Sequence, residues 1–207
     1  MHLLFDFDGT LVDSFNCVMN KGLLLAEQHG FRKIQQHEID ALRDLSSVEV
    51  LKYLKIPIYK IPQLILQMRK YLHQEIPSLM PVPGIQQIIE QFYYAKLNMG
   101  ILTSNAVNNV EEWLELNNMR QFFTFIHTES KYFSKGRLIK KVLKKYKIDK
   151  SKVVYIADET RDIEAAHKNN IRSLAVTWGY NSEQVLLKYK PSAVVRKPNE
   201  LLDLIQC

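Results

Sequence analysis

The chain has 207 residues, of which 46% are hydrophobic and 24% are charged. This composition is typical of a globular protein, and it excludes a disordered chain, a collagen-like repeat and a disulfide-rich scaffold. The net charge of +6 would suit a nucleic-acid-binding protein. However, residues 135–152 alone carry nine basic residues against one acidic residue, so the basicity belongs to one element and not to the whole surface.

Membrane and secretory functions are not expected from this sequence. No apolar run approaches the ~20 residues that span a bilayer, and Asp6 places a carboxylate too early for a signal peptide. The two cysteines, Cys17 and Cys207, lie at opposite ends of the chain without the spacing of a metal site. We therefore expect a cytoplasmic protein with no membrane partner. For the oligomeric state, on which the sequence is silent, we expect a monomer or weak dimer.

In chain order, the first predicted element is an apolar strand over residues 2–7, which Asp8 and Gly9 end. Helical periodicity then extends from residue 14 to about residue 71. Prolines and a glycine between residues 77 and 84 indicate a break between substructures. Beyond the break, predicted strands over residues 99–103, 122–126, 153–157, 173–177 and 193–195 alternate with predicted helices over residues 85–96, 107–116, 136–147, 162–169, 182–188 and 199–205.

This alternation predicts right-handed βαβ units and a parallel sheet covered on both faces. The predicted fold class is therefore α/β, with a Rossmann-like parallel sheet core flanked by helices and an inserted all-helical cap. The predicted domains are a core of residues 1–13 and 80–207 and a cap of residues 14–79.

The first candidate site is the motif from Asp6 to Thr10, at the end of the first strand. Side chains alternate along a strand, so Asp6 and Asp8 point the same way, about 6–7 Å apart if the backbone is extended. The carboxyl end of a parallel strand is where open α/β sheets bind ligands. Two carboxylates there repel each other, and a hard divalent cation would relieve that repulsion.

The second candidate site follows the apolar strand at residues 153–157. Asp158 stands at the strand end and Asp162 lies one helical turn later, so the two can face each other. Alone, this pattern could be a helix cap. Together with Asp6 and Asp8 on a neighbouring strand, it predicts a magnesium site held by these four aspartates.

Phosphate-binding groups are predicted beside these carboxylates. Thr103 ends an apolar strand, and Ser104 follows it before a helix, where hydroxyl and backbone N–H groups suit a phosphate oxygen. Lys135 stands just before the helix at residues 136–147 and would supply a fixed positive charge.

The sequence resembles the haloacid dehalogenase-like hydrolase superfamily, in the helical-cap subgroup. The phosphoglycolate phosphatase and β-phosphoglucomutase branch is most similar in layout, and the match covers nearly the whole chain. The sequence departs from the family's pattern at Gly136, where many relatives have proline after the lysine. The nearby Lys131 is therefore an alternative to Lys135 as the lysine of the site. The motifs that carry the resemblance are Asp6-Phe7-Asp8-Gly9-Thr10, Pro81-Val82-Pro83-Gly84, and Asp158-Glu159-Thr160-Arg161-Asp162, with Thr103 and Lys135 in the expected order between them.

The resemblance implies a magnesium-dependent phosphatase that acts on a small phosphorylated metabolite through an aspartyl-phosphate. Asp6 would be the nucleophile, and Asp8 would protonate the leaving alcohol and later accept a proton from water. Asp6, the Asp8 carbonyl and Asp158 would hold magnesium, with Asp162 as a ligand or a support. Thr103, Ser104 and Lys135 would hold the phosphoryl oxygens.

Other functions fit parts of the pattern. A dehalogenase is disfavoured, because family members that cleave carbon–halogen bonds lack the second acid, which is Asp8 here. A phosphomutase of the β-phosphoglucomutase type keeps the same core groups and stays open. A non-enzymatic domain would have a broken motif, and none is broken. A phosphatase acting on nucleotides or nucleic-acid ends would use the basic helix at residues 136–147, although a solvated face explains those lysines more simply.

The cap would determine the substrate in such an enzyme. Its expected contact loop lies near residues 43–46, where Arg43 could meet a substrate carboxylate or a second anionic group. A role as a helix-surface residue is the alternative for Arg43.

Overall fold

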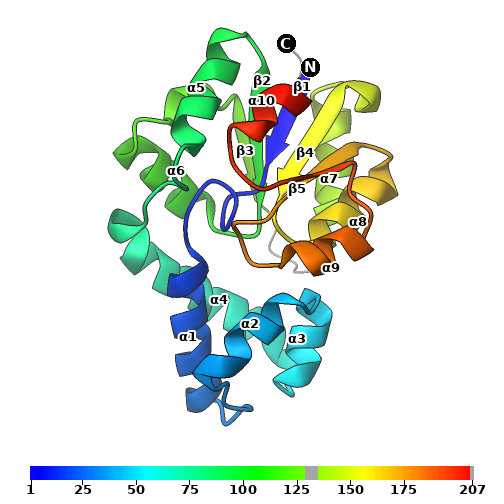
Figure 1. Cartoon of the computed structure of the whole chain (residues 1–207). Helices are drawn as coiled ribbons and strands as arrows, with labels where there is room; N and C mark the ends of the chain where they lie inside the picture. The colour runs from blue at the N-terminus through cyan, green and yellow to red at the C-terminus, as the bar shows by residue number, and fades with distance from the viewer. Residues whose placement is uncertain (129–134, 206–207) are drawn as a thin grey trace.

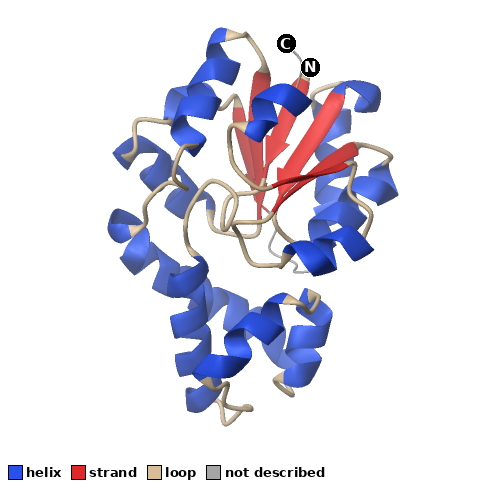
Figure 2. Ribbon diagram, viewed as in Figure 1, coloured by secondary structure: helices blue, strands red, loops and turns tan. Residues whose placement is uncertain are grey.

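The centre of the protein is a parallel sheet (Figures 1 and 2). The structure is a computed structural model, which describes residues 1–128 and 135–205. Lys131 and Cys207, which the sequence analysis considered, lie outside the described residues. The strand order is β3-β2-β1-β4-β5-β6, and every neighbouring pair is parallel. The expected α/β class is therefore confirmed. The strands are β1 (His2–Phe5), β2 (Asn98–Thr103), β3 (Phe125–Thr128), β4 (Val153–Ala157), β5 (Arg172–Val176) and β6 (Ala193–Val195).

Helices cover both faces of the sheet (Figure 2). They are α5 (Ile85–Tyr94), α6 (Val107–Leu116), α7 (Lys135–Lys145), α8 (Thr160–Asn169), α9 (Glu183–Lys188) and α10 (Glu200–Leu204). Side chains of β1 alternate between the two faces: Leu3 and Phe5 pack in the cluster that includes α5, α6 and α10, whereas Leu4 packs in the cluster that includes α7 and α8. Burial of both faces explains why the central strands β1 and β4 are mostly apolar.

A helical segment is inserted between β1 and α5, below the sheet in Figure 1. It consists of α1 (Phe15–Gln28), α2 (Ile39–Arg43), α3 (Ser47–Tyr53) and α4 (Ile61–Glu75), with short 3₁₀ turns at Gln36–Glu38, Ile58–Lys60 and Ile76–Ser78. Helix α3 begins with a capping box, in which the Ser46 side chain and the Glu49 side chain each bind the other residue's backbone N–H. Pro62 stands in the first turn of α4, where its missing N–H costs no hydrogen bond.

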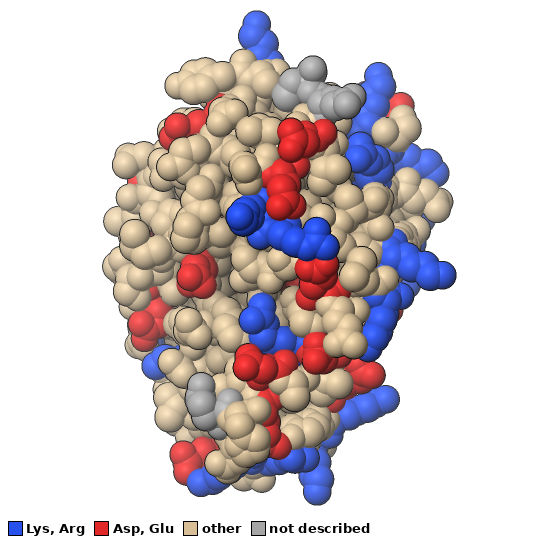
Figure 3. Space-filling view, in the orientation of Figure 1, with Lys and Arg blue, Asp and Glu red and all other residues tan. Residues whose placement is uncertain are grey.

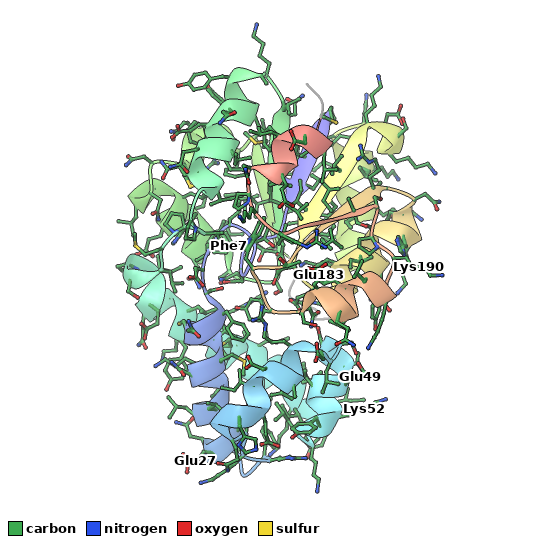
Figure 4. The ribbon with its side chains drawn as sticks, in the orientation of Figure 1. Phe7, Glu27, Glu49, Lys52, Glu183 and Lys190 are labelled. Atoms are coloured by element: carbon green, nitrogen blue, oxygen red, sulfur yellow. The ribbon has the colours of Figure 1, made fainter. Side chains whose placement is uncertain are left out.

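The chain enters and leaves this segment at one place. Val12 and Pro81 form an isolated bridge, the Asp13 amide donates to the Met80 carbonyl at 3.0 Å, and the Val82 amide donates to the Leu11 carbonyl at 2.9 Å. These bonds tie the two connections together. The assignment of residues 14–79 to a separate domain stays a prediction, and these residues are called the cap below. Figure 4 shows Glu49 and Lys52 on the cap and Glu183 on the core side of the junction.

The largest differences from the predicted strand boundaries are at the end of β1 and the start of β3. β1 ends at Phe5 because the Phe7 carbonyl accepts hydrogen bonds from the Leu11 and Val12 amides, which turns the chain into a tight loop. β3 begins at Phe125, and not at residue 122, because Arg120–Phe122 is a 3₁₀ turn. The Arg120 guanidinium donates to the Phe123 carbonyl at 2.8 Å and holds that turn.

Five of the nine basic residues in the segment 135–152 lie on the solvent face of α7, whereas Lys135 at its start is buried. Leu138, Ile139 and Val142 are buried against the sheet, and the lysines at positions 140, 141, 144 and 145 are exposed. Figure 3 shows basic side chains gathered along the right-hand edge, on the side where Figure 1 places α7 and α8. Within residues 1–128 and 135–205, no helix is both long and apolar enough to cross a membrane.

Candidate active site

The candidate site lies at the carboxyl ends of three adjacent strands. Asp6 directly follows β1, Thr103 ends β2, and Asp158 directly follows β4. Because β2 and β4 both pair with β1, these residues stand next to one another on one rim of the sheet. The structure thus places Asp6, Thr103 and Asp158 at the strand ends, where the sequence predicts them.

Asp6 and Lys135 form a buried ion pair at the centre of this rim. The Asp6 Oδ1 atom accepts a hydrogen bond from the Phe7 amide at 2.8 Å, and Oδ2 accepts one from Lys135 Nζ at 2.5 Å. Lys135 also pairs with Asp162. Burial opposes the charge of Lys135, but Asp162 and Asp6 outweigh it and hold the lysine pKa above its usual value. Burial raises the pKa of Asp6, and the charge of Lys135 counteracts part of that rise.

Asp8 is partly buried beside Asp6. Its Oδ2 atom accepts a hydrogen bond from Asn105 Nδ2 at 2.9 Å, whereas its Oδ1 atom has no hydrogen-bond partner in the described part of the chain. Burial raises the pKa of Asp8 to about 6, against the hydrogen bond from Asn105, which lowers it. Such a carboxyl group can hold and release a proton near neutral pH.

Asp158 is completely buried, and protein donors bind both of its oxygens. The Thr10 hydroxyl donates to Oδ1 at 2.8 Å and the Tyr180 amide donates to Oδ2 at 2.7 Å. Gly9, which has a φ of 74°, and Gly179 pack so closely that a Cβ atom on either would collide with the Asp158 carboxylate. The two glycines therefore let two loops close around this carboxylate.

Three carboxylates converge closely enough to hold a metal ion. Asp6, Glu159 and Asp162 each offer an oxygen, and these oxygens lie within 4.8 Å of one another. The Asp162 Oδ2 atom is buried and has no hydrogen-bond partner among the described residues. Burial raises the pKa of Asp162 to about 7, and burial with the charges of Glu159 and Asp6 raises the pKa of Asp158 well above its usual value. This crowded set of hard oxygen ligands fits a divalent cation.

The cluster differs from the predicted ligand set. Glu159 belongs to it although the sequence analysis did not single that residue out, and the side chains of Asp8 and Asp158 do not. The sequence feature that could have indicated Glu159 is its place next to Asp158 at the strand end. Which of these two carboxylates faces the metal site depends on how the backbone turns into α8.

The predicted phosphate-binding residues lie on the same rim. Thr103 is buried, and its hydroxyl accepts a hydrogen bond from the Asn105 amide at 3.0 Å. The Ser104 carbonyl accepts a hydrogen bond from Arg69 Nε of α4 at 2.8 Å. The roles of Thr103, Ser104 and Lys135 toward phosphate stay predictions.

Arg43 lies in the cap but binds the core. Its guanidinium donates to the Gly179 carbonyl at 2.9 Å and to the Thr177 carbonyl at 3.4 Å. In return, the Asn181 side chain donates to the carbonyls of Arg43 and Leu45, at 3.2 and 2.9 Å. The expected contact loop is therefore at the junction, but these bonds hold Arg43 against backbone carbonyls. Its role toward a substrate anion stays a prediction.

A cavity of about 310 Å³ lies between the cap and this rim. Its lining includes Asp6 and Asp8 on the core side and Arg43 and Arg69 on the cap side. A ligand in this cavity would therefore contact the candidate carboxylates directly.

The comparisons with known proteins agree with this geometry. The model of the haloacid dehalogenase-like hydrolase family matches residues 3–176. The chain therefore belongs to this family, and the expected class of enzyme, a phosphatase of the family, is confirmed.

Particular relatives match almost the full length of the chain. A phosphoglycolate phosphatase from Synechococcus elongatus is 30% identical over 203 residues, which cover 98% of this chain and 96% of that protein. The pyrophosphatase PpaX of Bacillus mycoides is 22% identical, over 98% of this chain and 95% of that protein. A haloacid dehalogenase-like hydrolase from Streptococcus pneumoniae has the same fold, with a TM-score of 0.80 at 22% identity and coverage of 99% of this chain and 98% of that one.

Proposed function

We propose that this protein is a magnesium-dependent phosphatase that hydrolyses a phosphate monoester of a small organic alcohol through an aspartyl-phosphate on Asp6. The observation that carries the proposal is the placement of Asp6 and Asp8. Both side chains line one cavity, Asp6 is paired with a buried lysine, and Asp8 has a raised pKa. One carboxylate can therefore act as a nucleophile while the other handles protons.

The first half of the reaction transfers the phosphoryl group to the protein. An Asp6 carboxylate oxygen attacks phosphorus, and the bond between phosphorus and the alcohol oxygen breaks. Asp8 gives its proton to the departing alcohol oxygen. Lys135 remains beside the nucleophile and, with Thr103 and Ser104, balances the negative charge of the phosphoryl oxygens.

The second half returns Asp6 to its starting state. Asp8, now a carboxylate, takes a proton from water as the water oxygen attacks phosphorus. The bond between Asp6 and phosphorus breaks and inorganic phosphate leaves. The cap, bonded to the core through Arg43 and Asn181, limits the access of bulk water to this step.

The cluster of Asp6, Glu159 and Asp162 supports a magnesium site. The family resemblance adds the backbone carbonyl of Asp8 and the Asp158 carboxylate to the ligand set. Magnesium bound there would supply positive charge to the nucleophile and the phosphoryl oxygens. The predicted partner is a small phosphorylated metabolite, and the predicted cellular site is the cytoplasm.

Phosphate release from a panel of monoesters tests this proposal. The panel contains phosphoglycolate, sugar phosphates, nucleotides and a 3′-phosphorylated oligonucleotide, each with and without magnesium. We expect magnesium-dependent release that Asp6→Asn abolishes. Asp13→Asn is the matched control, because Asp13 follows in the same loop but is exposed to solvent, and this variant should keep full activity.

The other outcomes separate the remaining alternatives. Phosphoryl return to a sugar phosphate in place of release would identify a phosphomutase. Absence of release from every compound would refute the proposal, and so would release that survives Asp6→Asn.

A further inference from the structure

The cavity between the cap and the core has two chemically different sides. Every residue that the described part of the core contributes to its lining is polar, from Asp6 and Asp8 to Tyr180 and Asn181. The cap side is mainly aliphatic. Its lining includes Val18, Met19, Val50, Leu51, Ile65 and Met68.

Among the cap residues whose side chains the structure describes, the three polar ones of the lining are directed toward the core. Arg43 donates to the Gly179 carbonyl, Arg69 donates to the Ser104 carbonyl, and Ser47 donates to Glu159. Their hydrogen bonds lie at the junction, so the interior of the cap is left to apolar side chains. A bound monoester would thus meet charged groups at its phosphate and apolar groups beyond it.

Gly22 is a second, independent feature of this apolar side. It lies within α1, and it lines the cavity. A Cβ atom built on Gly22 would meet no atom within 4 Å. Glycine inside a helix is less stable than alanine, so a larger residue at this position would favour the helix and fill the cavity. Gly22 keeps this space open at a cost in helix stability.

We propose that this space binds an apolar alcohol group, so that the preferred substrates are phosphate monoesters that carry an alkyl chain or a ring. This inference rests on the proposed phosphatase function. A cavity of about 310 Å³ is at the lower end of the range for ligand sites. An empty aliphatic cavity in a packed interior is destabilising, and an apolar group would fill it while Asp6 and Asp8 meet the phosphate.

The main rival is a small anionic substrate such as phosphoglycolate. Arg43 Nε is buried and has no hydrogen-bond partner among the described residues, so the arginine could also bind a carboxylate. The two possibilities differ in their dependence on apolar size. A carboxylate held by Arg43 gains nothing from added methylenes, whereas an alkyl group gains with each one.

The first test compares ethyl, butyl, hexyl and octyl phosphate with phosphoglycolate in the presence of magnesium. We expect kcat/KM to rise about twofold to fourfold per methylene until the cavity is full. A flat series, or phosphoglycolate above hexyl and octyl phosphate, would overturn the inference while leaving the phosphatase function intact.

The second test fills the space. Gly22→Phe should remove most of the difference in kcat/KM between octyl phosphate and ethyl phosphate. Leu24→Phe is the matched control, because Leu24 lies on the same helix with 44% of its surface exposed and outside the cavity lining. Preserved chain-length dependence in Gly22→Phe would contradict the inference.

Binding measured without turnover separates this inference from the proposed function. Calorimetry with ethyl, butyl, hexyl and octyl phosphonate reports affinity even where no phosphate is released. An affinity that rises with chain length in the unmodified protein, but not in Gly22→Phe, supports an apolar site, whatever the result with the monoesters. Affinity independent of chain length counts against it.

Discussion

The Ser47 hydroxyl of the cap donates a hydrogen bond of 2.8 Å to Glu159, one of the three carboxylates that could hold a metal ion. Arg161 binds the other Glu159 oxygen, with Nε at 3.0 Å from it. The same carboxylate therefore receives one bond from Ser47 of the cap and two from Arg161 of α8. The position of the cap and the orientation of a candidate metal ligand are therefore linked through Glu159.

Loss of the Ser47 hydroxyl should weaken magnesium binding more than it affects folding. In Ser47→Ala, Glu159 loses one hydrogen bond, worth about 0.5–1.5 kcal/mol, and it is less firmly oriented. We expect the magnesium concentration for half-maximal activity to rise about twofold to tenfold. A magnesium titration of phosphate release measures this shift, and Ser47→Thr, which keeps a hydroxyl, should reverse most of it. An unchanged titration in Ser47→Ala would show that the bond has no role in metal binding.

Lys135 should stabilise the folded protein as well as the site. In Lys135→Met, the carboxylates of Asp6 and Asp162 lose their buried cation. Removing one partner of a buried ion pair costs about 3–5 kcal/mol. Urea unfolding without metal should show a loss of this size, and magnesium should restore part of it because the cation replaces the lost charge. Lys140→Met, at an exposed position of the same helix, should change stability by less than about 0.5 kcal/mol. Equal losses in both variants would contradict this role for Lys135.

The sequence was sufficient for the sheet and for the strand-end carboxylates. Asp6 and Asp158 each follow a short apolar strand directly, and the geometry of parallel sheets brings such positions together without further information. The parallel, two-sided sheet followed from short, mostly apolar strands that alternate with helices. These inferences depend only on local periodicity and on the topology that βαβ units impose.

Other parts of the site depend on distances that local sequence does not determine. Glu159, and not the side chain of Asp158, belongs to the carboxylate cluster, and the Thr10 hydroxyl and the Tyr180 amide hold Asp158 in its own position. Nothing in the local sequence around Arg43 indicates the Gly179 carbonyl that it binds, and its role toward a substrate stays a prediction. The contacts of Thr10 with Asp158 and of Arg43 with Gly179 join residues more than a hundred positions apart, and the second of them forms only when the cap meets the core.

Gly179 should be required for the position of Asp158. A Cβ atom at residue 179 would overlap the Asp158 carboxylate, so Gly179→Ala must displace either the loop or the aspartate. We expect a loss of at least about tenfold in kcat/KM, together with weaker magnesium binding. Gly136→Ala is the control, because a Cβ atom there meets its nearest neighbour at 3.7 Å, an ordinary contact, and it should leave activity unchanged. Wild-type kinetics in Gly179→Ala would show that the site tolerates the displacement.

The Asn181 side chain should hold the cap closed. Its amide donates to the carbonyls of Arg43 and Leu45, while its oxygen accepts a hydrogen bond from the Thr160 amide at 2.9 Å. Asn181→Asp keeps the acceptor but places a carboxylate against two carbonyl oxygens, which repel it. We expect KM to rise about tenfold and amide hydrogen exchange to increase at residues 43–47. Asn199→Asp, the same change at an exposed position, controls for the added charge and should leave both measurements unchanged. If exchange at residues 43–47 stays as slow in Asn181→Asp as in the unmodified protein, the cap is held by other contacts.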